Sequence, residues 1–138
     1  VLIGDLAAIH DLNGWLQLRD VSTPITIVLI NNNGGNIFSF LPISKDEGFE
    51  TYFKTPQNIC FEKIADIAQI QYSQVTTVET LQSAYTSAMS KNGSALIEVV
   101  TSGAKEAFDE LLGSISQNHE RRGSILIKKD SMACTVNS

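Results

Sequence analysis

The stretch Ile25-Thr-Ile-Val-Leu-Ile-Asn-Asn-Asn-Gly-Gly35 decides the fold. Its first six residues are apolar or β-branched on both faces, which is the pattern of a strand buried inside a parallel sheet. The strand has to end at the three asparagines and two glycines, because these residues favour turns and tolerate positive φ. A buried parallel strand that stops at such a turn is typical of the ligand-binding edge of an α/β sheet.

The segments around this strand predict alternating strands and helices. We expect strands at 1–3, 25–30, 72–75 and 95–100, and helices at 6–16, 61–68, 77–89 and 108–115. This alternation predicts an α/β fold, with right-handed crossovers and a parallel sheet that carries helices on both faces. Residues 39–58 have no hydrophobic period and contain Pro42, Gly48 and Pro56, so we expect a long loop without regular structure there.

Length and composition limit the class of protein. A chain of 138 residues is the size of one domain. Its formal net charge is −5, and its basic residues concentrate only at Arg121, Arg122, Lys128 and Lys129. We therefore expect no nucleic-acid partner, since such binders carry a basic patch or stripe. We also expect no membrane span, because no apolar run approaches the roughly 18–20 residues needed to cross a bilayer.

The two ends of the chain suggest a part of a longer protein. The sequence begins at Val1 without Met, on an apolar stretch that predicts a strand already under way. We expect a domain at residues 1–118 that is truncated on its N-terminal side, and a tail or linker at 119–138. Cys60 and Cys134 lack disulfide or metal-ligand spacing. As free thiols without a visible signal peptide, they indicate a cytoplasmic location, or the chloroplast for a plant or alga.

Two polar clusters follow successive strands of the predicted sheet. Asp5 follows the first strand, and residues 31–35 follow the second. Taken singly, such an Asp is commonly a helix N-cap and such an Asn-Gly run is commonly only a turn. Together they should lie at one edge of the sheet and offer carboxylate, amide and carbonyl oxygens, which suit Mg²⁺. The glycines let the backbone approach a diphosphate, and exposed N–H groups attract its charge.

Gly4-Asp5-Leu6 and Asn31-Asn32 are separated by residues 7–30. This spacing resembles the thiamin diphosphate motif, in which Gly-Asp-Gly precedes Asn-Asn. Leu6 departs from the motif, since most members have Gly there, but one subfamily has Leu. The strings 4–14, 30–42 and 49–58 resemble that subfamily, the 2-succinyl-5-enolpyruvyl-6-hydroxy-3-cyclohexene-1-carboxylate synthases (SEPHCHC synthases, MenD) of menaquinone and phylloquinone biosynthesis. The resemblance runs to about residue 117.

The resemblance implies a thiamin diphosphate-binding (PP) domain fold and assigns residues to the cofactor. Mg²⁺ would be bound by side-chain oxygens of Asp5 and Asn32 and by the carbonyl oxygen of Gly34. Thiamin diphosphate would lie against residues of both polar clusters: Asp5, Leu6, Ala7, Asn32, Gly34, Gly35, Asn36, Ile37 and Phe38. Family members often have Ser at the position of Ala7, so one hydroxyl contact would be missing here.

The resemblance also implies a thiamin diphosphate-dependent transferase that decarboxylates 2-oxoglutarate and joins it to isochorismate. In this family the activating glutamate lies on a pyrimidine-binding domain, reached across a subunit interface. We therefore expect a homodimer or homotetramer, no catalytic residue in this segment, and no activity for the segment alone. The alternatives are another thiamin diphosphate-dependent decarboxylase or carboligase, against which Leu6 and Asn33 argue, and a non-enzymatic nucleotide-binding α/β domain.

Overall fold

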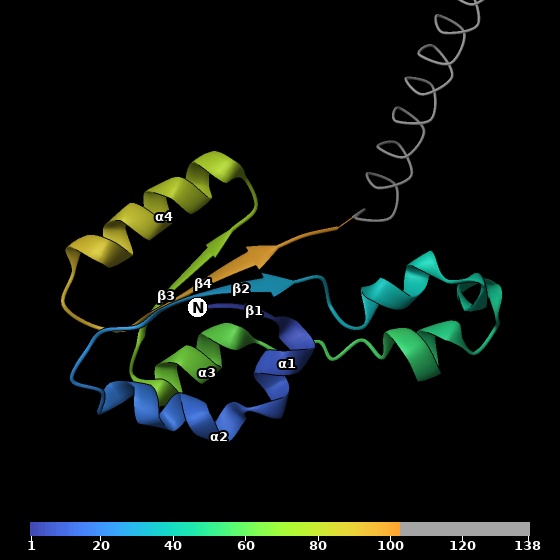
Figure 1. Cartoon of the computed structure of the whole chain (residues 1–138), viewed down its shortest axis with the longest axis horizontal. Coiled ribbons are helices and arrows are strands. Elements are labelled where there is room, and N and C mark those ends of the chain that lie inside the picture. Colours follow the sequence, from blue (N-terminus) through green and yellow to red (C-terminus); the bar gives the residue numbers. More distant parts are fainter. Residues whose placement is uncertain (103–138) are drawn as a thin grey trace, which may run out of the picture. The chain divides into compact units, whose positions relative to one another are not determined.

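Four parallel strands form the central sheet of the computed structural model, which describes residues 1–102 (Figure 1). The strands are β1 (Leu2–Gly4), β2 (Thr26–Asn31), β3 (Gln71–Val75) and β4 (Ala95–Val100), and their order in the sheet is β1-β2-β4-β3. Every pairing is parallel. The four strands expected from the sequence and the parallel α/β architecture are confirmed.

The register of the sheet brings the polar strand ends together. Gly4 at the end of β1 pairs with Ile30, and Asn31 at the end of β2 pairs with Val100. Asp5, the first residue after β1, is therefore level with the end of β2. Parallel strands place all their carboxyl ends at one edge, so this edge collects the residues that follow each strand.

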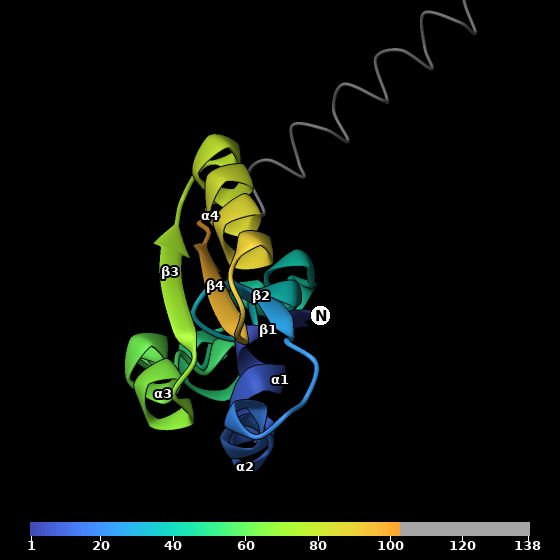
Figure 2. The same ribbon diagram turned by 90° about the vertical axis from the view of Figure 1, so that its left-hand side faces the viewer.

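Helices cover both faces of the sheet, as predicted. On one face lie α1 (Asp5–His10), α2 (Leu12–Trp15) and α3 (Phe61–Ala68), and on the other lies α4 (Val78–Ser90) (Figures 1 and 2). Adjacent residues of β4 divide between the two cores: Leu96 packs with the cluster that holds Trp15 and Phe61, and Ile97 packs with the cluster under α4. This division follows from the alternation of side chains along a strand.

The predicted helix at 6–16 is wrong as one continuous element. The chain leaves helical geometry at Asp11 (φ −111°, ψ 31°), so that α1, α2 and a 3-10 turn η1 (Leu16–Arg19) replace it. The bend returns Trp15 toward α1, where its indole N–H donates to the carbonyl of Ala8 at 3.1 Å. A buried indole N–H needs such a partner, and the hydrophobic spacing alone does not indicate it.

The expectation of an irregular loop at 39–58 also needs correction. Three short helical turns occupy most of this region: η2 (Asn36–Phe40), η3 (Pro42–Lys45) and the π-helical turn η4 (Glu50–Lys54). Turns of four or five residues are too short to show a hydrophobic period. Pro42 begins η3, where its missing N–H costs nothing. The segment lies beyond the carboxyl end of β2 (Figure 1).

The remaining expectations divide at the limit of the described residues. The helices predicted at 61–68 and 77–89 are confirmed as α3 and α4, and Thr77 caps α4 by accepting from the backbone N–H of Thr80. The predicted helix at 108–115, the domain limit at 118 and the tail at 119–138 lie outside the described residues. Within residues 1–102, no helix has the length and apolar character to cross a bilayer.

We predict that Leu96→Ala lowers the free energy of unfolding by about 2–5 kcal/mol, because Leu96 is fully buried between β2, β3 and the α3 face. The matched control is Leu2→Ala, whose side chain is 74% exposed and whose truncation should change stability by about 0.5 kcal/mol or less. Urea denaturation followed by the fluorescence of Trp15 measures both. Equal losses for the two variants would contradict this placement of the core.

Candidate functional site

Asp5 joins the ends of the first two strands. Its carboxylate is buried, with the residue only 5% exposed. One oxygen, Oδ1, accepts from the backbone N–H of Leu6 at 2.9 Å, and the other, Oδ2, accepts from the backbone N–H of Gly34 at 2.7 Å. The helix-cap interpretation is wrong: Gly4 is the N-cap residue of α1, Asp5 is its first helical residue, and no side-chain cap hydrogen bond forms. The second oxygen ties the start of α1 to the turn after β2, as the sequence predicted for these two clusters.

The turn after β2 has an unusual backbone. Asn33 adopts φ 60° and Gly34 adopts φ 122°, a region that β-carbons disfavour. Asn31 stabilises the turn by accepting the N–H of Asn33 on its side-chain Oδ1 at 2.9 Å, and Asn36 donates its side-chain N–H to the carbonyl of Asn32. Asn31 therefore stabilises the turn through its side-chain oxygen, and Asn36 does so through its side-chain N–H, which binds the backbone carbonyl of Asn32.

Asn32 offers a buried oxygen with nothing to bind. Its side-chain Oδ1 is inaccessible and accepts no hydrogen bond from residues 1–102. Buried polar atoms are nearly always paired, so an orphan acceptor indicates a missing partner. The oxygens of Asp5 retain further lone pairs, and the Gly34 carbonyl, which accepts from the N–H of Asn36 at 2.9 Å, retains one. These donors fit a hard cation such as Mg²⁺.

Glycine is required where this turn meets η4 and the residues after it. A β-carbon on Gly34 would lie 2.2 Å from the carbonyl oxygen of Lys54, and one on Gly35 would lie 2.7 Å from that of Phe53. Gly35 donates its N–H to the Lys54 carbonyl at 2.7 Å. The backbones of 34–35 and 53–54 are thus in direct contact, with no room for a side chain between them.

Asn33 and Asn58 fasten the far end of the 39–58 region to the same turn. The Asn33 side-chain N–H donates to Oδ1 of Asn58, and the Asn58 backbone N–H donates to Oδ1 of Asn33, both at 3.0 Å. Asn58 also has a positive φ of 50°. The region therefore leaves the turn through η2 and returns to it at 54–58, so its two ends share one anchor.

Aromatic side chains of this region pack on one another. Phe53 lies between Phe49, which it stacks against at a ring-centroid distance of 6.3 Å, and Phe38, which meets it edge to face at 6.1 Å. Phe49 is buried, whereas Ile37 is 72% exposed and Tyr52 is 78% exposed. The region thus has a small apolar centre of its own, and Ile37 and Tyr52 lie outside it, exposed to solvent.

The predicted site residues lie at the carboxyl edge of the sheet, but only some of them are joined by hydrogen bonds. Asp5 is bonded to Gly34, Gly35 to Lys54, and Asn36 to Asn32. Leu6 is half-buried, and Ala7, Ile37 and Phe38 are exposed.

Sequence reasoning missed one polar residue behind this edge. Glu98 lies in β4 with only 3% of its surface exposed, and it accepts from the side chain of Asn31. The signal was a carboxylate in the middle of Ala95–Val100, a strand that is otherwise entirely apolar. A lone charge in a buried strand needs partners, which the sequence does not identify.

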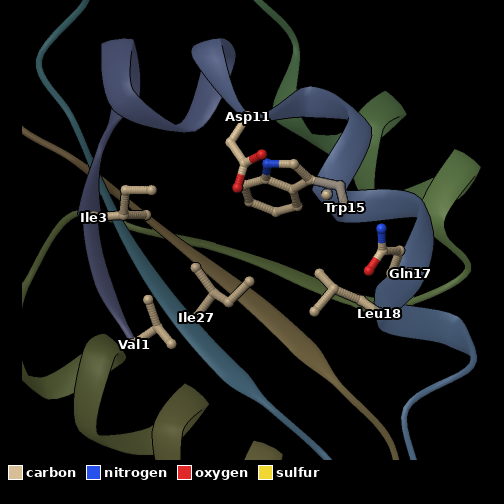
Figure 3. Close-up of a pocket in the computed structure, with 8 residues that line it drawn as sticks. Val1, Ile3, Asp11, Trp15, Gln17, Leu18 and Ile27 are labelled. Atoms are coloured by element: carbon tan, nitrogen blue, oxygen red, sulfur yellow. The ribbon is translucent and has the colours of Figure 1, made fainter.

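A cavity lies apart from the two polar clusters. A cavity of about 310 Å³ opens between β1 and the α2–η1 segment, lined by Val1, Ile3, Asp11, Gly14, Trp15, Gln17, Leu18 and Ile27 (Figure 3). None of these residues belongs to the two polar clusters. Its lining is mainly apolar, and within residues 1–102 no group of three or more His, Cys, Asp or Glu gathers there or elsewhere to bind a metal.

Sequence comparison matches residues 1–99 to the family described as thiamine pyrophosphate enzyme, C-terminal TPP binding domain. Curated relatives are 2-succinyl-5-enolpyruvyl-6-hydroxy-3-cyclohexene-1-carboxylate synthases. The protein of Oceanobacillus iheyensis is 46% identical over 73% of this chain, and that of Salinibacter ruber is 42% identical over 85%. The aligned parts are 18% and 20% of those proteins, so the chain spans about a fifth of their length. The subfamily resemblance seen in the motifs is confirmed.

A solved structure has a similar fold. The thiamine diphosphate-dependent 4-hydroxybenzoylformate decarboxylase of Rhodococcus jostii RHA1 superimposes with a TM-score of 0.61 at 25% identity. The alignment covers 72% of this chain and 19% of that one. The expected thiamin diphosphate-binding domain fold is thereby confirmed.

We predict that Gly34→Ala lowers the free energy of unfolding by at least about 1–3 kcal/mol, the range for a strained backbone conformation. The cause is the positive φ together with the clash against the Lys54 carbonyl. Gly4→Ala is the control, because Gly4 has φ −88° and a β-carbon there meets nothing within 4 Å. Chemical denaturation compares the two. A Gly34→Ala protein as stable as Gly4→Ala would contradict the described turn.

Proposed function

This chain belongs to the thiamine pyrophosphate enzymes, as their C-terminal TPP binding domain, and on that basis we propose that it anchors thiamin diphosphate through Mg²⁺ in a SEPHCHC synthase. The observation that carries the proposal is the buried, unpaired Oδ1 of Asn32. Asn32 lies in the turn after β2, and in that turn the backbone N–H of Gly34 donates to the carboxylate of Asp5. Asp5 and Asn32 would bind the metal by side-chain oxygens, and Gly34 by its carbonyl.

The diphosphate would lie against the backbone of the two polar clusters. Gly34 and Gly35 have no side chains to keep a ligand away, and Leu6 and Ala7 begin the first helix at the same edge. Asn36, Ile37 and Phe38 in η2 would border the thiazolium side. The exposed apolar surfaces of Ile37 and Phe38 fit contact with a largely apolar ring system.

The role of this chain is to bind and orient the cofactor. Thiamin diphosphate, when bound, supplies its own carbon nucleophile and electron sink. The residues of this chain hold the diphosphate end, fix its distance from the sheet edge and exclude water from it. Asp5 is the only carboxylate in the two polar clusters, and it would be occupied by the metal. We infer that the activating glutamate belongs to a pyrimidine-binding domain across a subunit interface, in a homodimer or homotetramer.

Substrate recognition would also lie mainly outside this chain. The substrates implied by the resemblance, 2-oxoglutarate and isochorismate, are polyanions, which proteins commonly bind with arginine. Arg19 is the only arginine within residues 1–102. It lies in η1 and pairs with Asp20 at 3.4 Å, away from the candidate metal ligands. The chain therefore contributes the cofactor anchor rather than the substrate pocket.

A decarboxylase is the alternative activity within the same cofactor class. The solved structure with a similar fold is a 4-hydroxybenzoylformate decarboxylase, but it is 25% identical to this chain, against 46% for the Oceanobacillus iheyensis synthase. The synthase is therefore the better supported proposal. Measuring product from 2-oxoglutarate with and without isochorismate, in the complete protein, separates a carboligase from a simple decarboxylase.

We predict that Asp5→Ala abolishes Mg²⁺-dependent binding of thiamin diphosphate in the complete protein. Asn32→Ala should weaken it by more than the roughly 10–100-fold that loss of an outer-shell group costs, and Asn32→Asp should weaken it less, because an oxygen remains. Titration calorimetry with thiamin diphosphate in the presence and absence of MgCl₂ measures these affinities. Asp66→Ala, on the exposed side of α3, is the control that should bind as the unchanged protein does. Unaltered affinity in Asp5→Ala would refute the metal site.

We predict that residues 40–56 gain protection from hydrogen exchange when Mg²⁺ and thiamin diphosphate bind. Hydrogen bonds join both ends of the region to the 33–35 turn. If the cofactor orders that turn, the region should become more ordered as well. Ordering a free residue costs about 1–2 kcal/mol, which the bound ligand would offset as the region closes over the diphosphate. The measurement is exchange in the complete protein with and without ligands. Equal protection in both states would mean that the region is a fixed packing element.

A further inference from the structure

Glu98 is a buried carboxylate without a cationic partner in the described part of the chain. It is 3% exposed, at the fourth position of β4. The ion pairs within residues 1–102 are Arg19–Asp20 and Lys54–Glu50, and Glu98 takes part in neither. Burying a carboxylate costs free energy unless hydrogen bonds satisfy it. Glu98 must therefore have hydrogen-bond donors around it.

Neutral donors from both neighbouring strands satisfy Glu98. Oε2 accepts from the phenol of Tyr72 and, at 3.4 Å, from the side-chain amide of Gln74, both in β3. Oε1 accepts from the side-chain N–H of Asn31 in β2. Burial, and then the hydrogen bond to Glu98 and its negative charge, raise the pKa of Tyr72, which keeps the phenol a proton donor. The carboxylate thus spans three adjacent strands.

Asn31 connects this carboxylate to the metal turn. A carboxylate can only accept hydrogen bonds, so Glu98 forces the amide of Asn31 to point its N–H toward β4. The Oδ1 of Asn31 is thereby turned toward the backbone N–H of Asn33, which it accepts at 2.9 Å. Asn32, whose buried oxygen lacks a partner, lies between these two residues in the chain. The orientation of one amide therefore fixes the residues on both sides of Asn32.

We propose that Glu98 is a positioning residue for the metal site: through Asn31 it holds the 31–33 turn in the conformation that aims the Asn32 oxygen at Mg²⁺. The inference rests on the proposed function, and it adds a residue of β4 to a site otherwise built from the ends of β1 and β2. Loss of a hydrogen bond to a metal ligand typically weakens metal binding 10–100-fold. Glu98 acts one step further out, because it bonds Asn31, the neighbour of a ligand. Glu98 itself does not contact the metal, the cofactor or a substrate.

Three substitutions distinguish the hydrogen bond of Glu98 to Asn31 in β2 from its hydrogen bonds to Tyr72 and Gln74 in β3. Glu98→Met removes every acceptor at similar length, Glu98→Gln keeps an oxygen that Asn31 can use, and Tyr72→Phe removes only the β3 side of the network. MgCl₂ is titrated into the complete protein at saturating thiamin diphosphate, and calorimetry gives the Mg²⁺ affinity. Urea denaturation without metal or cofactor gives the stability of each variant.

The Mg²⁺ affinity of each variant should depend on whether its hydrogen bond to Asn31 is kept, and not on its free energy of unfolding. We expect Glu98→Met to bind Mg²⁺ about 10-fold more weakly, the lower end of the range for outer-shell groups. Glu98→Gln should recover most of that loss, and Tyr72→Phe should bind Mg²⁺ as the unchanged protein does although it loses stability. In the background of Asn31→Ala, Glu98→Met should add little further loss, since residues that act through one another are not additive.

Three results would overturn the inference. They are unchanged Mg²⁺ affinity in Glu98→Met, an equal loss of affinity in Tyr72→Phe, and full additivity of Glu98→Met with Asn31→Ala. If Glu98→Met fails to fold, Glu98→Met is made in the Tyr72→Phe background, where no phenol is left without its acceptor. Mg²⁺ affinity equal to that of Tyr72→Phe alone would then overturn the inference. A complete protein without Mg²⁺-dependent thiamin diphosphate binding would instead refute the proposed function, and the inference with it.

Discussion

The hydrogen bond from the Gly34 N–H to Oδ2 of Asp5 is the contact on which the site edge depends. It joins two segments that are 29 residues apart in sequence and that meet only because β1 and β2 are parallel neighbours. Without this N–H and that of Leu6, the buried carboxylate would lack partners, at a cost that proteins rarely tolerate. With them, Asp5 is held at a fixed position beside Asn32, and the edge is organised by residues of the chain itself.

The second constraint is the absence of a β-carbon at Gly34 and Gly35, which lets two backbone segments come into direct contact. Gly34 and Gly35 allow the turn to touch the carbonyl groups of Phe53 and Lys54. The excursion at 36–58 is therefore a closed segment, fastened at both ends to one turn and filled by its own stacked phenylalanines. These contacts hold the segment beside the turn without a strand to support it.

The two faces of the sheet have different characters. Under α4 the apolar core holds the sheet residues Val75, Ala95, Ile97 and Val99, and Thr26 of β2 donates its hydroxyl to the sulfur of Met89 in α4 at 3.9 Å. The opposite face is apolar near Leu29 and Leu96 but becomes polar toward the carboxyl edge, where Glu98 and Asn31 lie. The buried carboxylate of the sheet thus lies on the face, and near the end, that lead to the turn.

The sequence by itself determined the strands, their alternation with helices and the placement of the two polar clusters at one edge, because each depends on local hydrophobic period and turn residues. It also identified the thiamin diphosphate family through Gly4-Asp5 and Asn31-Asn32. Tertiary structure alone decided the break at Asp11, the short turns at 36–54 and the partners of Glu98. Glu98 and Asn31 are 67 residues apart and become neighbours only through the strand order β1-β2-β4-β3. Contacts of this kind arise from the packing of whole strands, which no local pattern in the chain encodes.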